Sequence, residues 1–506
     1  MDIFDFDFAS LFELSNLIGI LLGTFVGLLI GALPGLGATV AIVILLPFTY
    51  GMEPLASILM LVAAYQAAEY GGSISSIILG IPGTPAAAAT ILDGNALAKQ
   101  NSPGKALAYS LTASSIGGLF GGIVLLFLSI PLAGIALRMG DPEFFLIGIL
   151  GLIAVAGLSG RDITRSFISV ILGLMAGTVG TDVISSARRF TMGIPELFDG
   201  MHLVAVLVGI FAVAEILSMI STELHRTYIR DNRGLSTRLS LSEFRQIGRA
   251  TVIGSTVGSI IGIMPGMGAG ASAWFSYSLA RNTSPTPETF GKGNPEGIAA
   301  PEAANNATVG GALLPLITLG IPGSASTAII LGAFIIHGIQ PGPSIFLTNT
   351  DLVYGIFYGF LLATIAMYVA GKLLTPLFAR VLKTPNYLLV PTVLTLALIG
   401  VYASNYLLFD LWLALIFGIA FFVLNKLDFS APAFILAFVL SPILEESLRR
   451  ALLISNGSYE MFVTRGYSIA ILLLIAGVLA LSVSGAVLRS SKRRKAARQG
   501  APAGSE

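Results

Sequence analysis

Two kinds of Pro-Gly signal interrupt this apolar sequence, and each kind occurs once in each half of the chain. Residues 31–38 read GALPGLGA and residues 262–269 read GIMPGMGA, whereas residues 79–84 read LGIPGT and residues 319–324 read LGIPGS. The first pair of prolines is separated by 265 − 34 = 231 residues and the second pair by 322 − 82 = 240. Such close offsets indicate one internal duplication with small insertions. Helix breaks at corresponding positions of two halves are typical of transporters that bind a solute between broken helices.

The composition indicates that the chain lies in a membrane. Hydrophobic residues make up 55% of the 506 and charged residues 11%, against about 25% charged in a typical soluble domain. Apolar stretches of about 20 residues, long enough to cross a hydrocarbon core of about 30 Å, recur along the chain. Because they are continuously apolar and do not alternate, they predict helices and not barrel strands.

The same composition excludes several classes of site. The chain has no cysteine, so it forms neither a disulfide framework nor a thiolate metal site, and its three histidines are far apart in the sequence. A net charge of +1 argues against nucleic acid as a partner. We expect no cofactor and no tightly bound metal.

We therefore expect an all-α polytopic membrane protein with roughly 10–12 transmembrane helices, plus broken or re-entrant ones. Apolar stretches at 38–50 and 269–280 are too short to cross and are expected to be half-helices, while the stretches 73–98 and 303–337 contain the second breaks. The predicted organisation has four parts: a first membrane repeat over 1–220 with motifs at 31–38 and 79–99, a basic loop over 221–249, a second membrane repeat over 250–488 with motifs at 262–270 and 319–327, and a basic tail over 489–506.

The basic residues predict the orientation. The loop 221–249 and the tail after 488 each hold six Arg or Lys residues, so both are expected in the cytoplasm. The acidic N-terminus lacks the positive region of a cleaved signal peptide and is expected outside, with the first apolar segment retained. The two repeats would then enter from opposite sides, which is an inverted-topology duplication. Smaller basic pairs at 188–189 and 449–450 leave the parity of this count open.

The breaks predict where an anion binds. Proline removes a backbone donor and glycine adopts unusual dihedrals, so the restarting half-helix points unpaired N–H groups and the positive end of its dipole into a cavity. The hydroxyls of Ser326 and Thr327 also follow a break. The predicted substrate-binding residues are Pro34, Gly35, Gly37, Thr39, Gly80, Pro82, Gly83, Thr84, Pro265, Gly266, Gly268, Gly320, Pro322, Gly323 and Ser324. The alternative is that these glycines only kink or pack helices, which is our preferred interpretation for GGLFGG at 117–122.

Polar residues within apolar segments predict a coupling site. Glu69 and Asp93 flank the first LGIPG break, and Glu302, Asn305 and Asn306 precede the second. Carboxylates with amide oxygens can ligate Na⁺ or carry a proton. We assign Glu69, Asp93, Asn305 and Asn306 as candidate cation-coupling residues. The alternatives are that Asp93 caps a helix and that Glu69 pairs with a neighbour.

Three strings resemble the large permease subunit of the bacterial tripartite tricarboxylate transporters: GALPGLGATVAIVILLPFTYGMEP, AAYQAAEYGGSISSIILGIPGTPAAAATILDGNALAKQ and LGIPGSASTAIILGAFIIHGIQPGP. The resemblance covers essentially the full length, and its motifs fall on the Pro-Gly residues named above. It implies an inner-membrane permease that imports a di- or tricarboxylate such as citrate by ion symport and is not an enzyme. It also implies an elevator-type movement and two partners, a small membrane subunit and a periplasmic solute-binding protein. Assembly of several copies stays open.

Other function classes find less support. A self-contained ATP-driven pump needs a GxxxxGK[ST] loop, which neither the GKA at 104–106 nor the GKG at 291–293 completes. An intramembrane serine protease needs a histidine within reach of Ser73 or Ser75, and none lies near in the sequence. A channel with re-entrant selectivity segments stays open as the alternative. The polar segment 281–302 is either a contact for a partner or a solvated loop.

Overall fold

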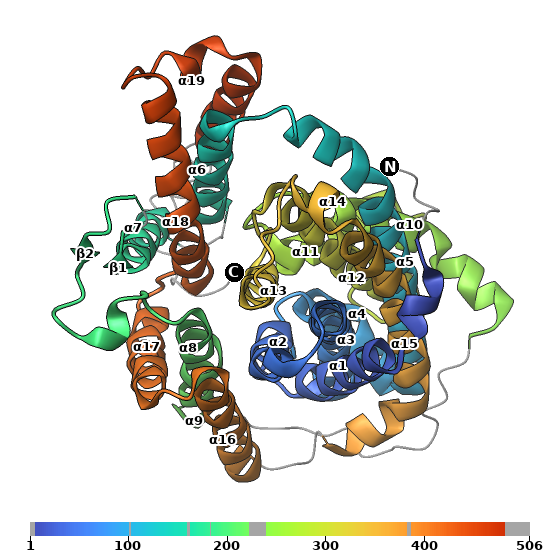
Figure 1. Cartoon of the computed structure of the whole chain (residues 1–506). Coiled ribbons are helices and arrows are strands. Elements are labelled where there is room, and N and C mark those ends of the chain that lie inside the picture. The colour runs from blue at the N-terminus through green and yellow to red at the C-terminus, as the bar shows by residue number, and fades with distance from the viewer. Residues whose placement is uncertain are drawn as a thin grey trace, which may run out of the picture. The chain divides into compact units, whose positions relative to one another are not determined.

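A computed structural model describes residues 6–100, 103–158, 162–182, 184–221, 239–381 and 386–480 (Figure 1). Almost all regular structure in these residues is helical. The strands are confined to a two-residue antiparallel pair, β1 (Gly180–Thr181) with β2 (Arg188–Arg189). The expected all-α polytopic class is therefore confirmed. The basic tail and residues 222–238 of the basic loop lie outside the described residues.

Seven described helices are long and apolar enough to cross a membrane: Leu14–Ala32, Pro103–Ala136, Leu203–Ser221, Thr350–Leu374, Tyr387–Asn405, Leu408–Lys426 and Ala431–Ile454. Two further long helices, Pro54–Leu79 and Pro295–Leu319, are almost fully buried and carry polar side chains. The expected ten to twelve crossings therefore stay a prediction.

The chain divides into two compact units, and each takes segments from both halves of the sequence. Unit 1 comprises Met1–Arg138 and Val179–Leu424, and unit 2 comprises Met139–Thr178 and Asn425–Glu506. Unit 2 contains α6 (Asp141–Leu158), α7 (Ile163–Gly177), α18 (Ala431–Ile454), the short α19 (Met461–Thr464) and a helix over Gly466–Ala480. Its buried Glu143 is paired with Arg465. The repeats over 1–220 and 250–488 stay a prediction. They divide the sequence into two halves, whereas each structural unit combines segments from both halves.

The helices of unit 1 follow the same order in the two halves. The first half gives α1 (Leu14–Ala32), α2 (Gly37–Leu45), a 3₁₀ turn (Leu46–Gly51), α3 (Pro54–Leu79), α4 (Ala87–Gln100) and α5 (Pro103–Ala136). The second half gives α10 (Leu241–Ile263), α11 (Gly268–Thr283), α12 (Pro295–Leu319), α13 (Ala325–Ile336), α14 (Ile345–Thr348) and α15 (Thr350–Val381).

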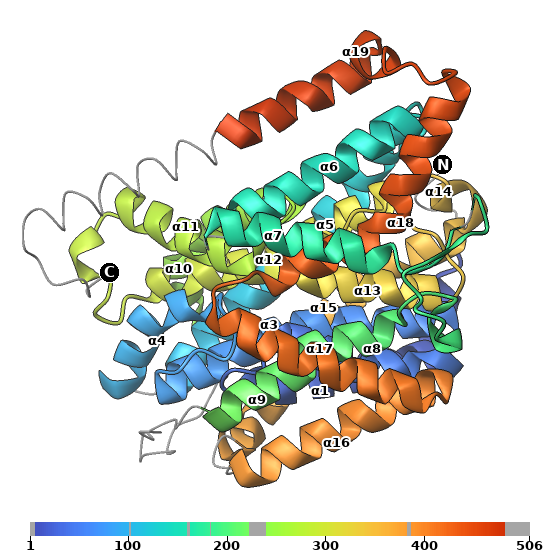
Figure 2. The ribbon, with the colours of Figure 1, turned by 90° about the vertical axis from the view of Figure 1, so that its left-hand side faces the viewer.

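The remaining helices of unit 1 are α8 (Leu203–Val208) and α9 (Ala214–Ser221), joined by the π-helical turn Gly209–Val213, with α16 (Asn386–Asn405) and α17 (Leu408–Lys426). Figure 2 shows α8 and α9 as one continuous run beside α17. A Cβ added at Gly209, in the turn between α8 and α9, would lie 2.5 Å from the carbonyl oxygen of Ala414 on α17, so this turn and α17 approach closely.

Rows of glycine hold α1 against α3 and α10 against α12. In α1 the glycines recur every fourth residue and face main-chain carbonyls of α3; the pairs are Gly19 with Ala56, Gly23 with Met60, Gly27 with Ala64 and Gly31 with Ala68. In α10 the pairs are Gly254 with Ala300, Gly258 with Ala304 and Gly262 with Thr308. Small residues at this spacing let helix backbones touch, which is the usual way that membrane helices associate. Gly23, Gly27 and Gly31 map onto the second row by adding 231, and their partners map by adding 240.

Two sequence-based boundaries were wrong. The stretch 73–98 was expected to begin at residue 73, yet residues 73–79 are the end of the longer helix α3, because Gly71 and Gly72 serve close packing against α1 and the break at Thr84 and do not interrupt the helix. Residues 295–302 were assigned to a polar loop, yet they form the first turns of α12. Asn294 caps that helix and Pro295 occupies its first position, where a proline is well tolerated.

Both short stretches that were expected as half-helices are confirmed as short. The helix α2 has 9 residues and α11 has 16, and both are shorter than a crossing requires. The break at Pro322 is also confirmed, since α12 ends at Leu319 and α13 begins at Ala325. These breaks position the candidate site.

Candidate functional site

The glycines of the four breaks have matching backbone conformations in the two halves. Gly35 and Gly37 have φ values of +88° and +65°, and Gly266 and Gly268 have +84° and +64°. Gly80 at +69° and Gly320 at +72° end α3 and α12 in the left-handed conformation. Since L side chains rarely adopt this conformation, glycine is required there to end one helix and start the next.

Each second break packs against the first break of its own half. A Cβ at Gly83 would contact the carbonyl of Gly31 and lie 2.6 Å from Cα of Gly72. A Cβ at Gly323 would lie 3.0 Å from the carbonyl oxygen of Gly262, and the Gly323 carbonyl accepts a hydrogen bond from the Gly266 N–H at 3.0 Å.

The breaks also meet across the two halves. Thr39 on α2 lies 3.4 Å, oxygen to oxygen, from Ser326 on α13. A Cβ at Gly270 on α11 would lie 3.5 Å from Cβ of Pro85, just before α4. Figure 1 shows α2 beside α13 in the view along the bundle. The fold therefore brings together the four motifs that the sequence placed in one site.

The half-helices differ in how their first N–H groups are used. The side chain of Ser324 caps α13 by accepting the Thr327 N–H at 3.2 Å, and Thr84 accepts the Ala87 N–H at 3.3 Å at the start of α4. The N-cap residues of α2 and α11, Leu36 and Met267, supply no side-chain hydrogen bond. The N-termini of α2 and α11 thus have backbone donors available for an anion.

Each break contains residues that are at least partly exposed. In the first breaks, Gly35 is exposed, Gly37, Thr39 and the stretch 265–270 are half-buried, and Pro34 is buried. In the second breaks, Pro85 is exposed and Gly80, Pro82 and Ser324 are half-buried, whereas Gly83, Pro322 and Gly323 are buried. All four breaks therefore have accessible residues, and the uncapped starts of α2 and α11 are among them.

A cluster of hydroxyl groups surrounds the start of α13. The Tyr65 hydroxyl on α3 lies 3.2 Å from the Ser324 hydroxyl, which lies 3.1 Å from that of Thr327. Sequence reasoning missed Tyr65. Tyr65 lies four residues before Glu69, and residues four apart on a helix share one face. This spacing could have identified Tyr65 as a candidate.

Glu302 is fully buried on α12 and accepts four hydroxyl hydrogen bonds. Its Oε1 accepts from Ser73 and Thr90, both at 2.5 Å, and its Oε2 accepts from Ser110 and Ser114, both at 2.9 Å. The donors come from α3, α4 and α5, so this carboxylate joins three helices of the first half to α12. No sequence signal identified these hydroxyls, because single Ser and Thr residues are common in membrane helices.

Asp93 on α4 is also buried and fully bonded. Its Oδ1 accepts the N–H groups of Gly291, Gly293 and Asn294 at 2.8–2.9 Å, and its Oδ2 accepts the Tyr277 hydroxyl at 2.9 Å. This geometry matches the alternative interpretation of Asp93 as a structural residue, although it anchors the turn before α12 and does not cap its own helix.

Glu69, Asn305 and Asn306 are buried with oxygens that lack partners. The Asn305 amide donates to the Glu69 main-chain carbonyl at 3.2 Å, and the Asn306 amide donates to the Gln66 carbonyl at 3.1 Å. Among the described residues, Oε2 of Glu69 and both amide Oδ1 atoms have no hydrogen-bond donor. The side chains of Asn305 and Thr84 lie within hydrogen-bonding reach of the Glu69 carboxylate.

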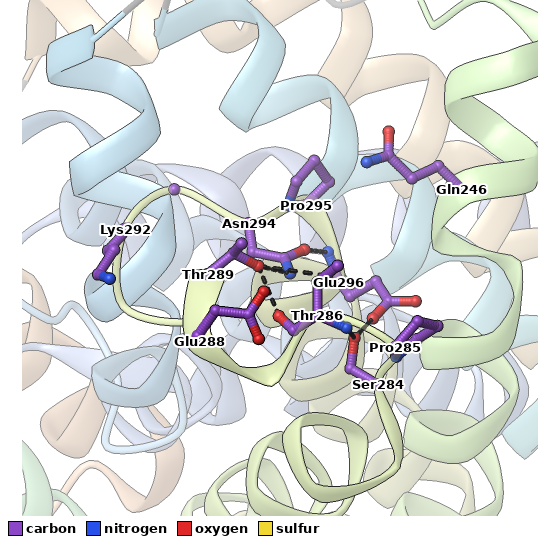
Figure 3. A pocket seen from close by; sticks show the side chains of 11 residues that line it. Gln246, Ser284, Pro285, Thr286, Glu288, Thr289, Lys292, Asn294, Pro295 and Glu296 are labelled. Atoms are coloured by element: carbon purple, nitrogen blue, oxygen red, sulfur yellow. Dashed lines mark hydrogen bonds between the residues drawn. The ribbon is translucent and has the colours of Figure 1, made fainter.

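A further acid lies near the first break, and a cavity lies beside Asp93. Oε1 of Glu215 on α9 would lie 3.6 Å from a Cβ at Gly35, so this acid lies beside the first break of the first half. The turn that Asp93 anchors forms an open cavity of about 590 Å³ between α10 and α12, lined by Thr289, Asn294 and Glu296 among others (Figure 3). Its lining includes none of the predicted site residues. Within the described ranges, no group of three His, Asp or Glu side chains is arranged to hold a metal.

The chain resembles known proteins over most of its length. Residues 17–436 match the model of the tripartite tricarboxylate transporter TctA family. It is 36% identical over 480 residues to an uncharacterised 52.8 kDa protein from the TAR-I ttuC' 3' region of Agrobacterium vitis, covering 95% of each chain. It is 38% identical over 215 residues to a protein from the TAR-II ttuC' 3' region of the same organism, covering 42% of this chain and 89% of that one. No solved structure matches the chain.

Proposed function

The chain belongs to the tripartite tricarboxylate transporter TctA family and is a multi-pass inner-membrane component of a transport system, and on this basis we propose that it imports a di- or tricarboxylate resembling citrate. The import is secondary active, driven by a Na⁺ or H⁺ gradient. A periplasmic binding protein delivers the substrate, and a small membrane subunit completes the system.

The observation that carries the substrate assignment is the pair of uncapped half-helices, α2 and α11. Each presents backbone N–H groups and the positive end of a helix dipole at an accessible break, where an anion is favoured. A di- or tricarboxylate has at least two carboxylates, one for each half-helix. The apolar segments 31–45, 79–98, 262–280 and 319–336 hold no Lys or Arg, so the peptide groups and hydroxyls are the donors at this depth.

Hydroxyl side chains would add specificity. Thr39, Ser326 and Tyr65 lie where α2 approaches α13, and their hydroxyls can turn toward a carboxylate or a substrate hydroxyl. A hydroxyl both donates and accepts, so this edge can distinguish a hydroxylated carboxylate from a plain one.

The inverted repeat and the elevator-type movement are part of the proposal. Support comes from the matching φ values of the glycine pairs and from helix contacts that repeat at the offsets 231 and 240. Two equivalent halves whose breaks face each other give one site that can open to either side of the membrane.

The negative charge of the buried carboxylates and of the substrate indicates that a cation is transported with the substrate. Glu69 and Glu302 are both buried and repel each other, and in the part of the chain that the structure describes no basic residue is among their electrostatic partners. A dianionic or trianionic substrate would add further negative charge beside them. Bringing that charge into a membrane without a cation is unfavourable, so Na⁺ or H⁺ has to accompany it.

Reconstitution tests this function against the channel alternative. Proteoliposomes with both membrane subunits receive purified binding protein and a panel of radiolabelled carboxylates under imposed Na⁺ or proton gradients. We expect saturable accumulation of one or a few di- or tricarboxylates above the external concentration. Flux that never exceeds equilibrium and does not saturate would favour a channel, and no flux of any carboxylate would refute the proposal.

A further inference from the structure

Three carboxylates lie within the buried helices and turns around the breaks, and their hydrogen bonds separate them. Both oxygens of Glu302 and both oxygens of Asp93 are occupied by donors. Oε2 of Glu69 has none among the described residues. A buried acceptor without a donor is rare and costly, and in a membrane segment it points to a ligand.

The second oxygen of the site comes from Asn305. Its Oδ1 is also buried without a donor among the described residues, and its amide nitrogen donates a hydrogen bond to the Glu69 carboxylate, so the two side chains are neighbours. The orientation of this amide is fixed, because its nitrogen donates to the Glu69 main-chain carbonyl and a flipped amide would place two oxygens against each other. The unpartnered oxygen is therefore available to a ligand.

Thr84 supplies a third oxygen and connects the site to the substrate. Its side chain lies within hydrogen-bonding reach of Glu69, and its hydroxyl also accepts the first N–H of α4. A ligand held by Glu69 thus lies beside the second break of the first half, which packs against the first break through Gly83.

We propose that a sodium ion binds between the Glu69 carboxylate and the Asn305 amide oxygen, beside Thr84, and that it is the coupling cation. Hard cations prefer oxygen ligands, and one sodium ion balances the single charge of the Glu69 carboxylate. One proton on Glu69 could satisfy a single acceptor, whereas Glu69, Asn305 and the adjacent Asn306 all carry unpartnered oxygens. The coupling role depends on the proposed function, but sodium binding does not.

Sodium binding is measured on the purified full-length protein without substrate. A ligand that binds only the folded protein raises its melting temperature. We expect NaCl to raise Tm by about 2 °C or more over equal concentrations of KCl or choline chloride at constant pH. Glu69→Gln and Asn305→Ala should abolish this sodium-specific rise. Glu53→Gln is the matched control: it makes the same change at an exposed glutamate before α3 that supplies no capping hydrogen bond, so it should retain the rise.

The outcomes separate the inference from the proposed function. An unchanged sodium-specific rise in Glu69→Gln, its absence in the unaltered protein, or its replacement by a pH dependence that needs Glu69 would each overturn the inference, whatever the uptake data show. A sodium-specific rise that requires Glu69, in a protein that imports no carboxylate, would refute only the coupling role and the proposed function. In proteoliposomes, Glu69→Gln should lose sodium-driven accumulation while Glu53→Gln keeps it.

Discussion

Replacing Gly83 by alanine should impair uptake more than the same change at Gly323. The new Cβ would lie closest to the carbonyl oxygen of Gly31, and also 2.6 Å from Cα of Gly72 and 2.8 Å from Oγ of Ser75, against 3.4 Å for an ordinary contact. The break therefore has to move by more than about 0.8 Å, and overpacking of this kind costs about 1–3 kcal/mol. Because 1.4 kcal/mol corresponds to a tenfold change, the apparent affinity should fall about 5- to 150-fold. The nearest atoms at Gly323 are 3.0–3.2 Å away, so Gly323→Ala should have a smaller effect in the same direction.

The assay is uptake into proteoliposomes at a substrate concentration well below KM, with the amount of folded protein checked by size-exclusion chromatography and thermal unfolding. Gly248→Ala on α10 is the control, because no atom lies within 4 Å of its added Cβ. We expect the uptake rates to fall in the order Gly248→Ala, Gly323→Ala, Gly83→Ala. Folded Gly83→Ala protein that transports as fast as the control would show that the geometry of the breaks does not hold the substrate.

Three further predictions concern the groups around the site. Asp93→Ala should lower the stability by about 3 kcal/mol, because three N–H groups and the Tyr277 hydroxyl lose their acceptor; a melting temperature equal to that of Asp93→Asn would contradict this role. Glu302→Gln should cost about 2–4 kcal/mol in thermal unfolding, because its new NH₂ group faces two hydroxyls that donate to Glu302; a change below 1 °C would exclude the four-hydroxyl arrangement. Lys105 donates to Glu243 and lowers the pKa of that carboxyl to about 2. The pair therefore stabilises the protein fully at pH values above the ordinary pKa of 4.5, and this stabilisation is lost as the pH falls toward 2. Because Lys105 is 42% exposed, Lys105→Met should lower the free energy of unfolding by no more than about 1 kcal/mol at pH 7. The difference in Tm between this variant and the unaltered protein should vanish near pH 2. A difference that stays constant from pH 7 to pH 2 would contradict the pairing.

The sequence predicted the breaks well, because Pro-Gly pairs act locally on the backbone. The matched dihedrals of Gly37 and Gly268 and the left-handed ends at Gly80 and Gly320 require glycine wherever the chain folds this way. The repetition of each motif then indicated which breaks correspond. The contact between α2 and α13 was predictable from that repetition, and no single residue indicated it.

The polar interior could not be predicted in the same way. Ser110 and Ser114 donate to Glu302 across 192 and 188 residues of sequence, and hydroxyl residues on apolar helices show no pattern that indicates their partner. The start of α12 was missed because its first turns are polar and proline-containing, although Asn294 and Pro295 are a good helix-start signal. Asp93 was grouped with Glu69 because both are acids near one break, and only their hydrogen bonds distinguish a satisfied carboxylate from an incomplete one.

The most direct test of the account is an experimental structure of the protein with its small subunit and a transported carboxylate identified in the uptake panel. The account predicts carboxylate oxygens about 3 Å from main-chain nitrogens at the starts of α2 and α11, with no Lys or Arg side chain in contact. A substrate bound in the cavity lined by Thr289, Asn294 and Glu296, or held mainly by basic side chains, would contradict it.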